Sequence, residues 1–530
     1  MLASVFTAVP ATATEPIGHL PSTADFVVQQ YEDFLSRGPD TAGLAYWTDQ
    51  LEQGVEPSAV VEALARSQEF EATIAPVVRL YSAFFNRPPD IDGLNHWVGV
   101  IRSGARLEQV AQAFVQSEEF RITYGSLDDG AYIDLVYTNV LSRPADAGGR
   151  AYWLGQLGDA VGLSRGDLMV QFSDSAEFRR LTEARVLATM LYVGMLRRAP
   201  DTAGLDYWAG VIDAGTPYRQ VIAGFLGANE YGQRMAAIYD EVHPLTGVAT
   251  RDASSRPALA VKIDNVDRAR PQYAIDRADI IYEELVEGRL TRLIAVFQSD
   301  LPDTVGPVRS VRTTDIDILA QLGRPLLSAS GANPGVLAVV AGSNVVNVNA
   351  LEAGAAYFRT SAKSAPHNLL ARPEVLYQAA NGQGTTPTPL FQYRERGVPL
   401  PGGSSTNGVE IDFGSTTVSY AWSPLAQGWD RRQNGSLHRV ASGDQLSPDN
   451  VVVLEVNYGV SAIDAQSPEA HTVGSGRTWV YTAGQVVEGT WTRASATDPI
   501  AVLDGNGQPI PLTPGQTIVE LAPTGSVTPR

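Results

Sequence analysis

Apolar residues recur at helical spacing throughout the first half of the chain. Two such stripes near its start are Val27, Tyr31, Phe34 and Leu35, followed by Leu44, Trp47 and Leu51. Asp40 stands before the second stripe, where a helix N-cap belongs, and Pro57 suits the first residue of the next helix. The pattern predicts clusters of short helices, each of which buries its tryptophan against itself and its neighbours.

This pattern occurs four times between residues 25 and 231, with a period of 50 to 56 residues. Each copy contains an arginine, an aspartate three residues later, a glycine, a tryptophan and a closing aromatic residue. The aspartates are Asp40, Asp90, Asp146 and Asp201, and the tryptophans are Trp47, Trp97, Trp153 and Trp208. Self-similarity at a fixed period predicts a repeat architecture. We therefore expect an all-α array over 25–240, with units at 25–70, 77–120, 131–178 and 186–231.

From residue 257 the pattern changes to strand-like runs mixed with helical segments. Residues 315–322 and 372–380 are expected to be helical, so 257–396 is predicted to be an α/β or α+β domain. After residue 409, apolar and polar residues alternate between turn signals, which predicts a mainly-β domain over 409–525. The expected linkers, rich in turn-forming residues, are 241–256 and 397–408.

The composition narrows the possible functions. With 44% hydrophobic and 18% charged residues the chain is globular, and a net charge of -19 argues against a nucleic-acid partner. The absence of cysteine excludes disulfides, thiolate metal sites, cysteine nucleophiles and a cysteine-linked lipid anchor. No phosphate-binding loop, nucleophile elbow, HExxH motif or dinucleotide fingerprint is present, so we expect no cofactor and no metal site.

The first 24 residues resemble the end of a secretory signal. An apolar run from Leu2 to Val9 precedes Ala11-Thr12-Ala13, a small-x-small cleavage pattern, although no basic segment comes before it. No uninterrupted apolar run is long enough to span a bilayer. We therefore expect 1–24 to be a leader remnant and the protein to be secreted to an extracytoplasmic, cell-surface location.

The most charged stretch runs from Ala258 to Asp315, where 18 of 58 residues are charged although the apolar runs predict buried strands. Read as a hairpin with a two-residue turn at Gly288-Arg289, it pairs Glu283 with Ile294 and Leu285 with Arg292. This register predicts that Glu283, Glu287 and Arg292 share one face of the sheet.

Other polar residues are expected to converge near this hairpin. They are Asp264, Asn265, Arg270, Gln272, Arg309, Arg312, Asn368 and His438 as candidate ligand-binding residues, and His367 as a second candidate proton carrier. Three hypotheses remain open. The charges form a structural network; or the arginines and amides bind an anionic or sugar-like ligand; or Glu283 or Glu287 acts as a catalytic acid or base.

Two resemblances to known families add to these predictions. The segments RPALAVKIDN, ARPQ, ADIIYEELVEG, TRLIAVFQS, GPVRSVR and APHNL resemble, in order, the motifs of the YerB-like bacterial lipoproteins. GWDRRQNGSLHRV, GSGRTWVY, VVEGTW and TPGQTIVEL continue the resemblance, which covers about residues 252–525. It implies an α/β sandwich-like domain and a smaller C-terminal domain in a cell-envelope family with no established activity. This chain lacks the lipobox cysteine, so lipid anchoring does not transfer.

The repeats resemble a bacterial surface-protein repeat of unknown function that is related to phycobilisome linkers. Its signature stands here as RGPDTAGLAYW, RPPDIDGLNHW and RAPDTAGLDYW, while RPADAGGRAYW departs by placing Arg150 where leucine is expected. The resemblance implies extracellular attachment or assembly. The motif aspartates could be helix caps or calcium ligands, and the tryptophans could be packing residues or sugar platforms.

Together these observations predict a secreted cell-envelope protein. Its repeats would serve attachment or assembly, and its YerB-like module would bind an anionic or glycan-like ligand such as cell-wall or surface glycan. The alternative is an enzyme that acts on a cell-wall polymer through the Glu/Arg cluster. The oligomeric state stays open.

Overall fold

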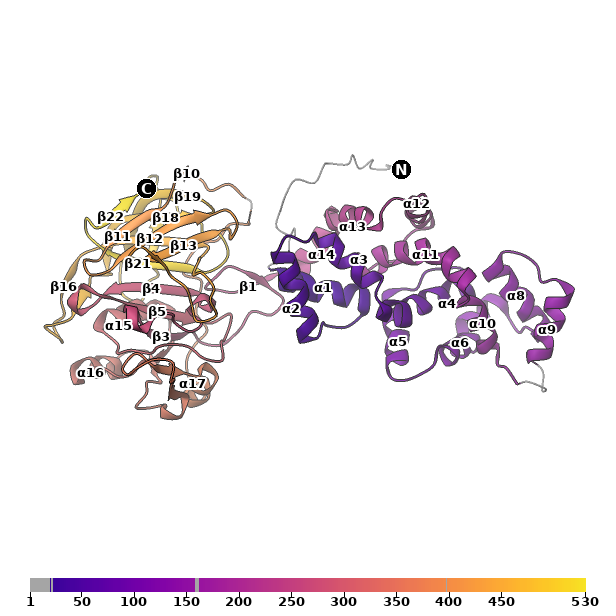
Figure 1. Ribbon diagram of the computed structural model, residues 1–530, viewed down its shortest axis with the longest axis horizontal. Coiled ribbons are helices and arrows are strands. Elements are labelled where there is room, and N and C mark those ends of the chain that lie inside the picture. The colour runs from indigo at the N-terminus through magenta and orange to yellow at the C-terminus, as the bar shows by residue number, and fades with distance from the viewer. Residues whose placement is uncertain (1–19, 21, 158–161, 397) are drawn as a thin grey trace. The chain divides into compact units, whose positions relative to one another are not determined.

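The computed structural model describes residues 20, 22–157, 162–396 and 398–530, which form two compact units that meet in sequence at Tyr239 and Asp240 (Figure 1). The leader expected at 1–24 lies almost wholly outside the described residues. The first unit is helical and the second is built on β-sheet, which confirms the predicted multidomain fold class.

The helical unit contains fourteen α-helices among its described residues. They are α1 (Thr23–Leu35), α2 (Thr41–Glu52), α3 (Pro57–Ala65), α4 (Ala75–Phe85), α5 (Ile91–Arg102), α6 (Leu107–Val115), α7 (Glu118–Tyr124), α8 (Asp129–Leu141), α9 (Ala147–Leu157), α10 (Arg165–Ser173), α11 (Ala176–Met190), α12 (Thr202–Asp213), α13 (Tyr218–Leu226) and α14 (Asn229–Ile238). Short π-helical turns at Phe70–Ile74 and Leu191–Met195 join neighbouring helices.

The repeated motif is a local packing device. The Asp40 side chain caps α2 by accepting a hydrogen bond from the Gly43 N–H at 2.8 Å, and Asp90, Asp146 and Asp201 do the same in their copies. The hydroxyl of Tyr31 lies against Gly43, where a Cβ would be 2.7 Å away. Arg37 lies over the Tyr31 ring and is paired with Glu69. The aspartates are therefore helix caps, as the capping alternative predicts.

The motif tryptophans are half-buried and pack against the helical core, as the repeated pattern predicts. Trp97, Trp153 and Trp208 each lie against the phenylalanine of a following helix, with ring centroids 5.1 to 5.3 Å apart.

The repeats pack in pairs that do not follow their order in the chain. Helix α3 of the first copy packs against α13 of the fourth, and α6 of the second packs against α10 of the third (Figure 1). Buried ion pairs join the same partners. Arg79 of the second copy contacts Asp174 of the third at 2.8 Å, and Asp33 of the first contacts Arg234 of the fourth at 2.7 Å. The four copies therefore share one continuous core.

The second unit is organised around a mixed sheet of eleven described strands. In spatial order they are β10 (Ser404–Ser405), β19 (Gln485–Arg493), β18 (Gly474–Thr482), β15 (Asn450–Val456), β21 (Thr517–Pro523), β4 (Ile280–Leu285), β5 (Thr291–Phe297), β3 (Leu259–Asp264), β6 (Leu326–Ser328) and β7 (Val346–Asn347), with β20 (Ala501–Leu503) beside β19. Because β21 pairs in parallel with β4, segments from both sides of residues 397–408 contribute to one sheet.

Smaller elements cover the two faces of this sheet. A five-stranded sheet shares one hydrophobic core with it, in the order β14 (Ser436–Leu437), β13 (Gly428–Gln433), β12 (Thr417–Ser423), β11 (Val409–Asp412) and β22 (Val527–Pro529). The opposite face packs against α15 (Thr313–Leu319) and α16 (Pro334–Gly342). Further elements are α17 (Pro373–Ala380), several 3₁₀ turns, and the strand pairs β1 (Glu241–Val242) with β2 (Ala249–Thr250), β8 (Tyr357–Arg359) with β9 (Leu369–Ala371), and β16 (Tyr458–Val460) with β17 (Pro468–Ala470).

Candidate functional site

The pairing register of the hairpin formed by β4 and β5 differs from the predicted register by one residue. Glu284 lies opposite Arg292 and Glu283 lies opposite Leu293, because the Val286 N–H donates to the Leu290 carbonyl and leaves a three-residue turn between them. Side chains alternate along a strand, so this shift places Glu283 and Arg292 on opposite faces. The prediction that Glu283, Glu287 and Arg292 share a face is therefore wrong, and the charges form two separate groups.

The first group, the closed network, lies between the two sheets. Glu283 Oε2 accepts a hydrogen bond from Arg431 at 2.6 Å, and its Oε1 accepts one from Asn265 at 3.0 Å. The Tyr420 hydroxyl donates to Glu520, which pairs with Glu283 in the register of β21 and β4. The other members are His438, Gln272 and Gln433, and all eight side chains are at most 2% exposed.

Burial controls the charge states in the closed network. It raises the pKa of Glu520 well above its usual range, and the negative charge of Glu283 raises it further. Burial also lowers the pKa of His438, with Arg431 adding to the effect, so His438 is neutral at pH 7. The positive charge of Arg431 offsets only part of this rise in the pKa of Glu520. Since no member is open to solvent, Glu283, Asn265, Gln272 and His438 are out of reach of a polymer substrate.

The second group, the arginine rim, lies on the other face at the carboxyl end of β3. Asp264 Oδ2 is 2.7 Å from His367 Nδ1 and 3.1 Å from Arg309 Nε, and its Oδ1 is 3.5 Å from Arg292 Nε. Asp264 is fully buried, whereas the side chains of Arg292, Arg309 and His367 are 10%, 24% and 16% exposed. The rim is therefore a buried carboxylate surrounded by two guanidinium groups and an imidazole that reach the surface.

Three segments far apart in the chain position the arginine rim. Arg292 lies directly opposite Asp264 in the register of β3 and β5. An isolated β-bridge between Ile263 and Val308 holds the segment around Val308 beside β3. The Arg309 N–H therefore donates to a β3 carbonyl. His367 comes from the loop between β8 and β9.

Asn368 and Lys363 hold that loop in place rather than facing a ligand. The Asn368 carbonyl oxygen accepts from Arg359 at 2.6 Å, and its amide donates to two loop carbonyls. Lys363 donates to the carbonyls of Ala269 and Pro271. Both side chains therefore support the position of His367.

Glu287 and Arg312 form an ion pair on the same face. Two parallel hydrogen bonds of 2.6 and 2.8 Å join them, and the Ser467 hydroxyl also donates to Glu287. Burial alone would raise the pKa of Glu287, but these hydrogen-bond donors lower it to about 2. Glu287 is thus a permanently ionised partner of Arg312. Arg270 pairs with the exposed Asp267 and lies outside the rim.

A buried triad that the sequence reasoning missed lies beneath this face. Lys262 contacts Asp315 at 2.7 Å and also donates to Glu284, and all three side chains are fully buried. Burial raises the pKa of Glu284 to about 7, with a further contribution from Asp315 that Lys262 only partly offsets. The lysine inside the apolar strand ALAVKID could have predicted this triad, because a buried ammonium group needs carboxylate partners.

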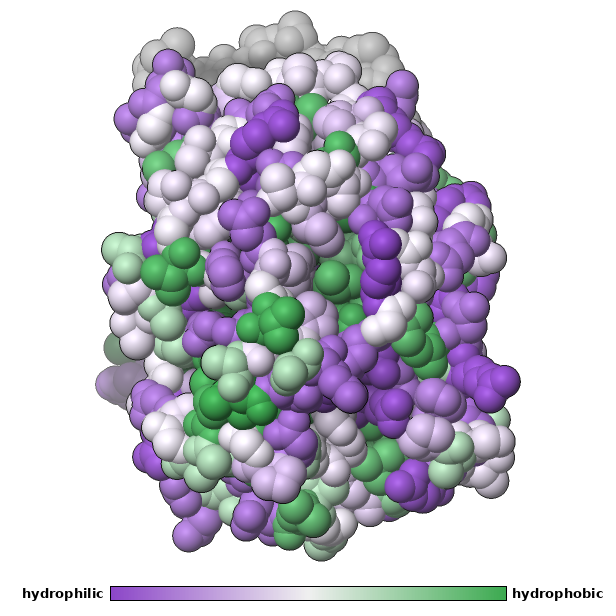
Figure 2. Space-filling view, turned by 90° about the vertical axis from the view of Figure 1, so that its left-hand side faces the viewer, coloured by the Kyte–Doolittle hydropathy of each residue, from purple (hydrophilic) through white to green (hydrophobic). Residues whose placement is uncertain are grey.

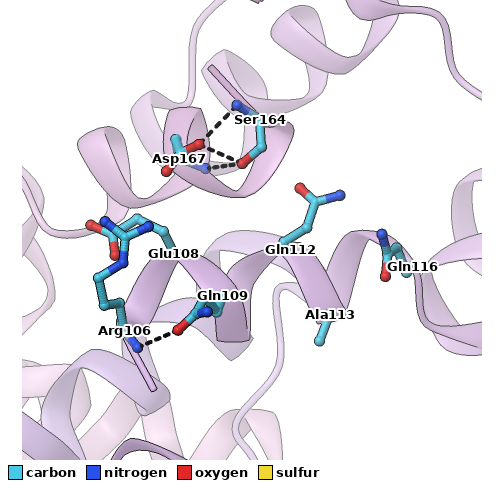
Figure 3. Close-up of a pocket in the computed structure, with 8 residues that line it drawn as sticks. All are labelled: Arg106, Glu108, Gln109, Gln112, Ala113, Gln116, Ser164 and Asp167. Atoms are coloured by element: carbon cyan, nitrogen blue, oxygen red, sulfur yellow. Dashed lines mark hydrogen bonds between the residues drawn. The ribbon is translucent and has the colours of Figure 1, made fainter. Parts of the chain in front are cut away.

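Other surfaces give weaker indications of a functional site. Figure 2 shows one side of the sheet unit, on which hydrophobic residues lie in separate groups among hydrophilic ones. A shallow pocket of about 260 Å³ lies between α6 and α10, and in its lining Gln109 accepts a hydrogen bond from the Arg106 N–H (Figure 3). Gln112 of the same lining accepts one from the Gly166 N–H at the start of α10. Over the described residues, no group of three or more His, Asp or Glu side chains could hold a metal ion. None of the helices within the described ranges is long and apolar enough to cross a membrane.

Family models match nearly the whole of both units. The N-terminal domain of the protein family of unknown function DUF3048 matches residues 245–386, and its C-terminal domain matches 409–519. A domain of unknown function, DUF4214, matches four overlapping or adjacent segments of the helical unit, at 9–74, 77–122, 111–182 and 183–235.

One curated relative agrees with these matches. A Bacillus subtilis (strain 168) protein named "Putative lipoprotein YerB" is 28% identical over 293 residues, which cover 53% of this chain and 86% of that protein. A crystal structure of YerB from the same species aligns with 24% identity over 55% of this chain and 99% of that one, with a TM-score of 0.49. The family models and the curated relative confirm the resemblance predicted from the ordered motifs.

Proposed function

This chain belongs to the YerB-like family through residues 245–519, and on that premise we propose that its sheet unit binds an anionic ligand of the cell envelope. The protein is secreted, and the helical repeats attach it or assemble it at the cell surface. The name of its relative, which describes a lipoprotein, and the leader-like residues 1–24 support this location.

One observation carries the ligand proposal: two guanidinium groups share the single carboxylate of Asp264. Within the part of the chain that the structure describes, the guanidinium group of Arg309 has no partner other than Asp264, and that of Arg292 also donates only to the Thr291 carbonyl. Burial lowers the pKa of Arg292, and the like charge of Arg309 lowers it further although Asp264 raises it. A phosphate or carboxylate group bound by the free N–H groups would relieve this repulsion.

Binding to purified cell walls tests the proposal. Arg309→Gln removes the positive charge of a partly exposed side chain of the arginine rim. The fraction of the protein that sediments with Bacillus subtilis walls should therefore fall. Arg477→Gln is the matched control, since Arg477 is an exposed arginine of the same unit that pairs with Glu488 and lies over the Trp479 ring, away from Asp264. Walls stripped of their anionic side polymers should bind less wild-type protein. Equal sedimentation of Arg309→Gln and wild type would overturn the proposal.

The contact between His367 and Asp264 favours a second candidate, an enzyme that acts on the same polymer. A buried carboxylate beside Nδ1 fixes the imidazole tautomer and leaves Nε2 as a proton acceptor. His367→Gln should then stop release of soluble wall fragments while binding persists, and Glu283→Gln in the closed network should leave release unchanged. Wild-type protein that releases no fragments from walls would eliminate this candidate.

Attachment by the repeats has its own test. Deletion of residues 25–231 should release the sheet unit from cells into the medium. Unchanged retention of the shortened protein would refute an anchoring role for the repeats.

A further inference from the structure

One motif position in the helical unit has no structural role that explains its residue type. The side chain before each motif tryptophan is exposed, and it is Tyr46, His96, Tyr152 or Tyr207 in successive copies. The three tyrosines are 56%, 59% and 62% exposed. Elsewhere in the described part of this unit, the only exposed large apolar side chains are Ile122 and Leu181. Exposed aromatic residues are thus concentrated at one repeated position.

The exposed rings have a fixed orientation. Each stands edge-on to the neighbouring tryptophan, with centroids 4.7 to 5.0 Å apart and planes at 72° to 78°. The tryptophans are held in turn by the core, so each ring presents a face to solvent in a defined direction. Such a ring is a preorganised stacking surface rather than a mobile side chain.

Glycines lie one helical turn beyond three of these rings. Gly99, Gly155 and Gly210 are inside α5, α9 and α12, and a Cβ added to any of them would meet no atom within 4 Å. Glycine is a poor helix former, and here no neighbour requires it. The motif glycines differ, because a Cβ at Gly93 would be 2.4 Å from the Tyr81 hydroxyl. The unexplained glycines leave bare backbone beside the rings, since residues three apart are neighbours on a helix surface.

We propose that these positions are carbohydrate-binding sites, at which a pyranose ring of a neutral polysaccharide stacks on the exposed aromatic ring and extends over the bare backbone. The inference rests on the attachment role proposed for the repeats and names the ligand class of that role. The third and fourth copies carry the complete arrangement in Tyr152 with Gly155 and Tyr207 with Gly210. The second copy has His96 with Gly99, and the first has Tyr46 with Asp49.

Charge and repetition favour this ligand over other molecules that stack on aromatic rings. Residues 1–239 contain 29 carboxylates and 17 arginines, a net charge of -12 that repels nucleic acids and anionic polymers. The axial C–H groups of a pyranose are positively polarised and suit the negative face of an aromatic ring. A polymer of repeating sugars can also engage several equivalent sites at once, which raises its affinity without further contacts.

Affinity electrophoresis of the full chain tests the proposal. Gels that contain hydroxyethylcellulose, dextran or soluble β-1,3-glucan should retard the wild type, and Tyr152→Ala with Tyr207→Ala should weaken the apparent affinity about tenfold or more. Tyr152→Phe with Tyr207→Phe keeps both rings and should bind like wild type. Ile122→Ala with Leu181→Ala is the matched control, because it removes exposed apolar surface elsewhere in the same unit.

A second pair of variants separates binding from folding. Gly155→Gln with Gly210→Gln fills the open space beside the rings and improves helix propensity, so retardation should fall while the Tm does not. The proposal is overturned if none of the three polysaccharides retards the wild type, or if the alanine pair migrates like wild type. It is equally overturned if only alginate, poly-dT or a polymer of quaternary amines retards the chain.

Failure of this proposal can be distinguished from failure of the attachment role. Retardation by a neutral polysaccharide together with unchanged cell retention after deletion of 25–231 would refute attachment alone. Loss of retention after the deletion, without retardation in any gel, would refute carbohydrate binding alone.

Discussion

The Nδ1 atom of His367 lies 2.7 Å from Oδ2 of Asp264, although the two residues are 103 positions apart in the chain. The same carboxylate is the counter-ion of Arg292 and Arg309 and is fully buried. Asp264 therefore holds together three groups from separate segments, and its removal should affect both the stability of the sheet unit and its ligand binding.

Asp264→Asn should lower the free energy of unfolding of the sheet unit by about 3 kcal/mol. The substitution leaves two partly buried guanidinium groups without a counter-ion, and an uncompensated buried charge is strongly destabilising. Urea unfolding followed by tryptophan fluorescence measures the change. Asp300→Asn, which breaks only the exposed pair with Arg277, should cost less than about 1 kcal/mol. Equal effects of the two variants would contradict this account of Asp264.

Glu284 should make the sheet unit less stable as pH rises. Its pKa is about 7 in the folded protein and 4.5 ordinarily, so the folded state binds more protons between these values. The resulting stability is fully present below pH 4.5 and is lost as pH rises through 7, a decrease on the order of 3 kcal/mol. Burial likewise raises the pKa of Asp279 to about 6, which adds to the same trend.

Glu284→Gln tests this pH dependence. The variant should lose less stability between pH 4.5 and pH 8 than wild type, with the Asp279 contribution remaining. Urea unfolding at several pH values gives the slopes. A variant with the wild-type slope would show that Glu284 does not titrate in this range.

Arg431→Met should lower the free energy of unfolding by about 3 to 5 kcal/mol, because it removes the cationic partner of the buried Glu283 side chain. Adding Glu283→Gln should recover part of the loss, since the uncompensated charge is then gone. The neighbouring Arg432→Met is the control, as Arg432 is exposed and should change stability little. A double variant no more stable than Arg431→Met would contradict the proposed charge pairing.

Two glycines of α5 should respond in opposite directions. Gly93→Ala places a Cβ 2.4 Å from the Tyr81 hydroxyl, so it should lower the Tm of the helical unit. Gly99→Ala adds a Cβ in open space, and its better helix propensity should stabilise the unit by about 0.5 to 1 kcal/mol. Thermal unfolding followed by circular dichroism compares them. Shifts of the same sign would show that the Tyr81 contact does not require glycine.

Local patterns predicted the elements of this protein well. The aspartate caps, the helical repeats and the helices near 315 and 373 follow from spacing and from individual residue types, and the structure has them all. The hairpin was harder, because its alternation fits two registers that differ by one residue. The choice depends on whether Glu287 belongs to the strand or to the turn, and the sequence does not specify this.

The sequence by itself determined the helical repeats, the family resemblance and the stretch in which the charged groups gather, since each depends on residues close together in the chain. Only the tertiary structure decided how those charges divide. Pairing of β3 with β5 and packing of residues 305–311 beside β3 bring Arg292, Arg309 and His367 to Asp264, while the second sheet encloses Glu283 with Arg431. A one-residue change of register places Glu283 and Arg292 on opposite sides of the sheet, because neighbouring side chains on a strand point to opposite faces.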